Sequence, residues 1–128
     1  MARSMAAEMH SGYVPLRKAC SMNVRKRFPA QPTNAAVAEN VARIDALWGH
    51  ARTRFGADGP YLFGTFGAAD IMFAPVVFRI HGYELPISEI TQAYIEAMLA
   101  HPWMVEWVEA AHAETWVLEQ YEGGPIYA

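Results

Sequence analysis

One segment of the sequence combines glycines with a carboxylate, as some phosphate-binding and catalytic loops do. It is LFGTFGAADIMFAP, which runs from Leu62 to Pro75 and places two glycines and Asp70 before an apolar run. A phosphate loop needs a Lys followed by Ser or Thr after its glycines, and a dinucleotide-binding loop needs a preceding strand. Because Gly67 is followed by Ala-Ala-Asp, we reject both interpretations.

The same residues fit the start of a helix. If Gly67 is the N-cap, Asp70 is the third helical residue, and its carboxylate can accept a hydrogen bond from the N–H of the cap. Its charge also complements the positive end of the helix. Phe66 before the cap and Ile71 at the fourth helical position match a hydrophobic staple. Glycine has no side-chain oxygen, so the sequence predicts only half of a capping box.

The other reactive side chains give no complete catalytic or metal-binding set. Cys20 is the only cysteine, so no internal disulfide forms, which favours a reducing compartment and a cytoplasmic location. Arg17 and Lys18 could lower its pKa, but an ordinary free thiol is the simpler interpretation. The five histidines include no pair three or four residues apart on one helix, so we predict no metal site.

Composition and charge limit the class of protein. A chain of 128 residues with 53% hydrophobic and 18% charged residues is expected to form one globular domain. It has no apolar run long enough for a membrane span and no secretion signal. All ten Lys and Arg lie before Ile80, whereas eight of the thirteen acids follow it. The run Arg25-Lys26-Arg27 is expected to be a solvated turn, since the acidic second half would repel nucleic acid.

Apolar periodicity predicts a helical bundle without strands. The first helix is expected over residues 1–19, with Met5, Met9, Tyr13 and Leu16 on one face. It begins without a capping residue, so we expect it to be truncated at its start. The other helices are expected over residues 35–55, 67–78, 88–100 and 102–118.

Three segments together resemble the C-terminal helical domain of glutathione S-transferases, with the closest likeness to bacterial members. FGAADIMFAPVVFRI is similar to the start of the central buried helix of that domain, with Gly67 where Ser or Thr usually stands. ARSMAAEMHSGYVPLRKACSMN resembles its first helix, and AYIEAMLAHPWMVEWVEAA resembles its last two. The resemblance implies one all-α domain over residues 1–128, a bundle of about five helices.

The resemblance also implies partners. In this family a thioredoxin-like domain holds the thiol-activating residue and most glutathione contacts, and residues 1–128 contain no such segment. We therefore assign no catalytic residue and no cofactor bound by this chain alone, and expect it to be inactive in isolation. The complete enzyme would use glutathione as co-substrate, take a small hydrophobic electrophile and form a homo-oligomer. The alternative is a free-standing interaction domain or a remnant of a transferase.

Position in the family assigns candidate residues to the wall of the electrophile pocket. They come from the first helix and the C-terminal end, and they are Met5, Met9, His10, Tyr13, Val14, Trp116 and Tyr121. Tyr13 fits the core or the dimer interface equally well. We expect the Met5/Met9 and Trp103/Trp107 pairs to pack in the core. The apolar face of the first helix is expected to meet another domain or subunit, so the isolated chain is predicted to associate.

Overall fold

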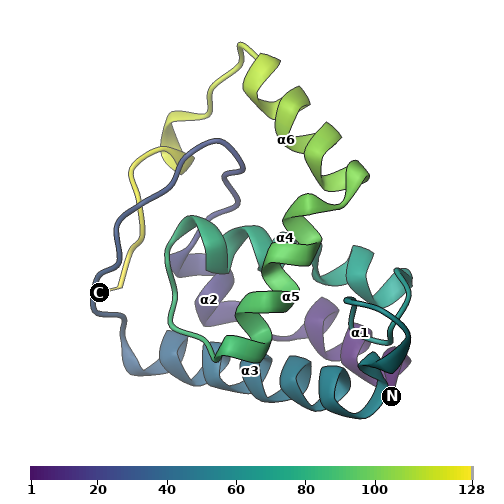
Figure 1. Cartoon of the computed structure of the whole chain (residues 1–128). Helices are drawn as coiled ribbons and strands as arrows, with labels where there is room; N and C mark the ends of the chain where they lie inside the picture. Colours follow the sequence, from purple (N-terminus) through teal and green to yellow (C-terminus); the bar gives the residue numbers. More distant parts are fainter. Residues whose placement is uncertain (128) are drawn as a thin grey trace.

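The computed structural model describes residues 1–127, and within them it contains helices and loops but no β-strand, which confirms the predicted all-α class (Figure 1). Six α-helices and two single 3-10 turns follow one another along the chain. They are α1 (Ala2–Ser11), α2 (Val14–Ala19), α3 (Ala35–Phe55), η1 (Gly56–Asp58), α4 (Ala68–Gly82), α5 (Glu89–Ala100), α6 (Pro102–Ala113) and η2 (Glu119–Tyr121).

The single helix predicted over residues 1–19 is wrong, because the chain bends between α1 and α2. Tyr13 adopts a left-handed conformation with φ 59°, and Pro15 lies in the first turn of α2. Proline has no N–H and clashes with the preceding turn, so α1 cannot continue through it. The Tyr13 hydroxyl donates a hydrogen bond to the Glu8 carboxylate, which Arg43 of α3 binds through two nitrogens at 3.0 and 2.9 Å. These contacts fasten the bend to α3.

Helix α4 forms the centre of the core, as its apolar sequence predicts. Nine of its fifteen residues are buried, and it packs against α1 on one side and α5 on another. Trp48 of α3 meets the rings of Phe73 and Tyr94 edge-on, with centroid distances of 5.5 and 5.0 Å. Buried residues of all six α-helices belong to one core, with α4 at its centre.

The start of α4 has the predicted half capping box. Asp70 is 1% exposed, and its carboxylate accepts a hydrogen bond from the N–H of Gly67 at 2.9 Å. It also accepts bonds from the N–H of Leu62 at 3.2 Å and from the Tyr94 hydroxyl at 2.9 Å, two partners that the sequence did not predict. The carboxylate therefore joins the loop before α4 to α5 as well as capping α4.

The two staple residues lie in different environments. Phe66 stacks on His101 with ring centroids 3.9 Å apart and meets Trp103 edge-on, which ties the loop before α4 to the corner between α5 and α6. Ile71 is 48% exposed. The staple between Phe66 and Ile71 stays a prediction.

The C-terminal part of the chain differs from the predicted last helix. Helix α6 ends at Ala113 and not at Leu118, because the Glu114 carboxylate accepts hydrogen bonds from the N–H groups of Thr115 and Trp116. Such local side-chain bonds compete with continuation of a helix. The expected core packing of Trp103 and Trp107 is also wrong, since they are 57% and 39% exposed. Within α6 only Met104 is buried.

Candidate functional site

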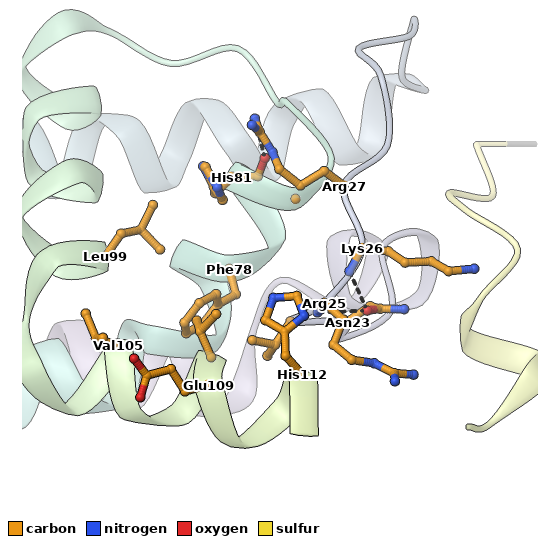
Figure 2. A pocket seen from close by; sticks show the side chains of 13 residues that line it. Asn23, Arg25, Lys26, Arg27, Phe78, His81, Leu99, Val105, Glu109 and His112 are labelled. Carbon is orange, nitrogen blue, oxygen red and sulfur yellow. Dashed lines mark hydrogen bonds between the residues drawn. The ribbon is translucent and has the colours of Figure 1, made fainter. Parts of the chain in front are cut away.

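A cavity of about 340 Å³ lies between the C-terminal half of α4, the end of α5, α6 and residues 23–27 (Figure 2). Apolar side chains from three helices form its floor, namely Phe78, Leu99, Val105 and Val108. This size and lining suit a small apolar or aromatic molecule, because ligand pockets are mostly apolar clefts with few polar groups.

The polar groups of this cavity come mainly from two histidines and one glutamate. His81 of α4 and His112 and Glu109 of α6 border the apolar floor (Figure 2). Partial burial, followed by the charge of Arg27, lowers the pKa of His81 below its ordinary value, so its imidazole is neutral at pH 7. A neutral imidazole can donate one hydrogen bond and accept another. The described residues that line the cavity include no hydroxyl or thiol side chain that could act as a nucleophile.

Residues 23–27 form one wall of the cavity through an ordered turn. The Asn23 side-chain oxygen accepts hydrogen bonds from the N–H groups of Arg25 and Lys26 at 3.1 and 3.0 Å. In the view of Figure 2 the side chains of Arg25 and Lys26 extend away from Phe78 and Leu99. Arg25 and Lys26 therefore supply mainly backbone to the cavity, whereas the Arg27 side chain lies beside His81 and donates a hydrogen bond to its backbone oxygen at 3.4 Å.

The structure separates the residues that the sequence assigned to the electrophile pocket. Met5, Met9 and Tyr13 are 2%, 9% and 7% exposed and belong to the core. Leu16 is fully buried as well, so the apolar face of the first helix is covered within this chain and the expectation that it is exposed is wrong. Helices α4 and α3 cover this face because α1 packs on α4 and α2 packs on α3. The predicted core packing of Met5 and Met9 is confirmed.

The remaining candidates are exposed, two of them around the bend between α1 and α2 and two in the segment after α6. His10 is exposed at the end of α1, and Val14 is 43% exposed at the start of α2. Trp116 and Tyr121 follow α6 and are 83% and 42% exposed. Figure 1 shows α1 and the C-terminal segment at opposite ends of the bundle. Their roles in a pocket stay predictions.

Sequence reasoning missed the residues that line the cavity. Val105 and Val108 are three residues apart on one helix, which is a signal for an inward-facing pair, but the same spacing is equally typical of packed core. Only the arrangement of α4, α5 and α6 in space shows that a hollow lies between them.

Two further searches of the described residues bear on the kind of protein. No group of three or more His, Cys, Asp or Glu side chains in residues 1–127 gathers to hold a metal ion. No helix in the same range has the length and apolar character that a membrane span requires.

The fold and the cavity together define an all-helical domain with a mainly apolar cavity between α4, α5 and α6. Comparison with protein families identifies it: a family model described as "Glutathione S-transferase, C-terminal domain" matches residues 34–110, which is more than half of the chain. The chain therefore belongs to the glutathione S-transferase C-terminal domain family. Comparison with curated proteins and comparison with solved structures both gave no match.

Proposed function

We propose that this chain supplies the helical half of a glutathione transferase, and that the cavity between α4, α5 and α6 receives the apolar co-substrate. The observation that carries the proposal is a mainly apolar cavity bordered by His81 and His112, inside a domain of this family. The lining formed by the described residues includes no Ser, Tyr or Cys side chain that could donate a hydrogen bond to a glutathione thiolate, and we propose that a second domain activates the thiol.

The exposed surface of α6 supports a partner domain. Nine of its twelve residues are exposed, and its two tryptophans are among the exposed large apolar side chains. Exposed apolar surface of this kind marks interaction sites. We propose that a thioredoxin-like glutathione-binding domain packs beside α6, and that the assembled protein forms a homo-oligomer that conjugates glutathione to small electrophiles in the cytoplasm.

The test supplies the missing domain. Two proteins are assayed with glutathione and 1-chloro-2,4-dinitrobenzene. One is the chain alone, and the other is a fusion that carries the thioredoxin-like domain of a bacterial glutathione S-transferase before Met1. In this reaction the glutathione thiolate attacks the carbon that bears chlorine, and chloride leaves. The proposal expects no activity from the chain alone and measurable activity from the fusion. Activity of the chain alone would contradict it.

A pair of variants of the fusion locates the co-substrate. Val108→Trp fills the cavity, whereas Ala38→Trp places the same ring at an exposed position of α3, outside the cavity lining and away from α6. We expect Val108→Trp to raise the KM for the electrophile at least fivefold with the KM for glutathione unchanged, and Ala38→Trp to leave both unchanged. Equal effects would place the electrophile elsewhere, and an inactive fusion would favour the interaction-domain alternative.

A further inference from the structure

The C-terminal tail, defined as residues 114–127, is held to the body of the domain mainly by polar contacts. None of its residues is buried, and its large apolar side chains Trp116, Leu118 and Ile126 are 83%, 61% and 67% exposed. Burial of apolar surface is the main source of stability in a protein core, and this segment gains little of it. What fixes the tail must therefore lie in its hydrogen bonds and ion pairs.

Those contacts converge on one short segment, residues 19–26. The Glu122 carboxylate pairs with Arg25 at 3.3 Å and with Lys26 at 2.8 Å. The Lys26 ammonium also donates to the backbone oxygen of Glu122, and the Asn23 amide donates to the backbone oxygen of Tyr121. Figure 1 shows the tail running beside the stretch that follows α2.

The end of the tail covers the single thiol. The N–H of Ile126 donates to the backbone oxygen of Ala19 at 2.9 Å, and the Tyr127 hydroxyl lies 3.4 Å from the Cys20 sulfur. Gly124 makes the necessary turn with φ +92°, a conformation that favours glycine. Cys20 is fully buried beneath these residues.

The tail spans a hollow. A cavity of about 210 Å³ remains between it, residues 22–25 and Ala111 of α6. The backbone of Arg25 and Lys26, the two cations that pair with Glu122, is ordered without help from the tail. The Asn23 side-chain oxygen accepts hydrogen bonds from both of their N–H groups. The tail is therefore fastened by one carboxylate, that of Glu122, to a cationic pair whose backbone is already ordered, and a cavity lies beneath it. Such a segment can detach from the domain without a change in the core.

We propose that the tail is a strap closed by Glu122, which opens as a unit while the helical body stays folded and thereby exposes Cys20. Hydrogen bonding from Lys26 holds the pKa of Glu122 below its usual value, in keeping with a carboxylate that stays ionised in the closed state. The strap rests on these contacts and stands apart from the proposed function. It bears on that function because residues 23–27 also form a wall of the co-substrate cavity.

The test uses Cys20 as a built-in reporter, since it is the only thiol in the chain. Its rate of reaction with 5,5′-dithiobis(2-nitrobenzoic acid) is measured under native conditions for the wild type, Glu122→Gln and Glu119→Gln. Glu119 is a tail carboxylate that makes no ion pair in residues 1–127, so its variant removes the same charge without the contact. We expect Cys20 of Glu122→Gln to react at least fivefold faster than Cys20 of the wild type, and Glu119→Gln to react at the wild-type rate. All three proteins should have the same urea unfolding midpoint.

Two further measurements separate strap opening from general loosening. The double variant Lys26→Glu/Glu122→Lys, which swaps the two charges, should react at Cys20 at a rate closer to that of the wild type than Glu122→Gln does. Raising NaCl from about 0.05 to about 1 M should speed the wild type and leave Glu122→Gln unchanged, because salt screens exposed ion pairs. Equal rates for Glu122→Gln and Glu119→Gln, or reaction only at the rate of global unfolding, would overturn the proposal.

Discussion

Helix α4 and helix α6 have similar apolar character in the sequence but opposite positions in the structure. Nine of fifteen residues are buried in α4, whereas only Met104 is buried among the twelve of α6. Helix α4 is surrounded by other helices of the same chain, while α6 packs on α5 and leaves Trp103 and Trp107 exposed. The apolar character of a helix in the sequence therefore does not show by itself that the helix is buried within its own chain.

The largest expected difference between the two helices is the cost of removing an aromatic ring. Phe73→Ala in α4 should lower the free energy of unfolding by about 3–5 kcal/mol, the usual cost of emptying a core site. Trp103→Ala in α6 should lower it by less than about 1 kcal/mol, because the side chain is 57% exposed. Urea unfolding followed by circular dichroism measures both. Equal losses would contradict the contrast.

The second expected effect concerns the buried cap of α4. Asp70→Asn should cost about 2–3 kcal/mol, since the amide keeps one acceptor oxygen and turns its NH2 group toward at least one of the three donors that the carboxylate accepts from. Tyr94→Phe removes one of those donors and should cost about 1 kcal/mol. The control lies at the start of α3, where the Asn34 side-chain oxygen accepts a hydrogen bond from the N–H of Val37. Asn34→Asp keeps an acceptor at this position and should be close to neutral in the same urea unfolding assay.

A smaller effect is expected at the bend between α1 and α2. Hydrogen bonds from Arg43 and then Tyr13 lower the pKa of Glu8 in the folded chain, so this ion pair stabilises the fold above the unfolded pKa of Glu8. The contribution is lost as pH falls through the lower, folded pKa. The Arg43 side chain is 55% exposed, so Arg43→Gln should cost less than about 1 kcal/mol at pH 7. Its difference from wild type should shrink below about pH 4; a difference constant between pH 3 and 7 would exclude the ion pair as its cause.

The smallest expected effect is a gain. A side chain at Gly67 meets nothing within 4 Å, and the residue has an extended conformation that any amino acid adopts. Gly67→Ser would supply the missing half of the capping box and should raise the free energy of unfolding by a few tenths of a kcal/mol. Gly67→Ala is the control and should not stabilise. A gain from both would point to lower entropy of the unfolded chain instead of the cap.

The sequence was sufficient for the fold class and for the role of Asp70, because helix starts and apolar periodicity are local properties. It was insufficient at the bend before Val14, where Pro15 and the side chains of Glu8 and Arg43 act together across two helices. It also failed for the exposed face of α6, since exposure depends on which surfaces neighbouring helices leave uncovered.

The candidate site was harder to predict than the fold. Phe78, Val105 and Val108 are ordinary apolar residues, and only their arrangement around a hollow distinguishes them from core. Position in the family instead pointed to Met5 and Met9, which α4 covers in this structure.

In this account the chain divides into a packed helical body and a C-terminal part, α6 and residues 114–127, that buries little apolar surface. Native-state hydrogen exchange of the isolated chain tests this division most directly. We expect amides in α4 to exchange only through global unfolding, and amides in α6 and residues 114–127 to exchange through local openings of much lower free energy. Exchange of α6 at the same free energy as α4, with the same dependence on urea, would contradict the claim.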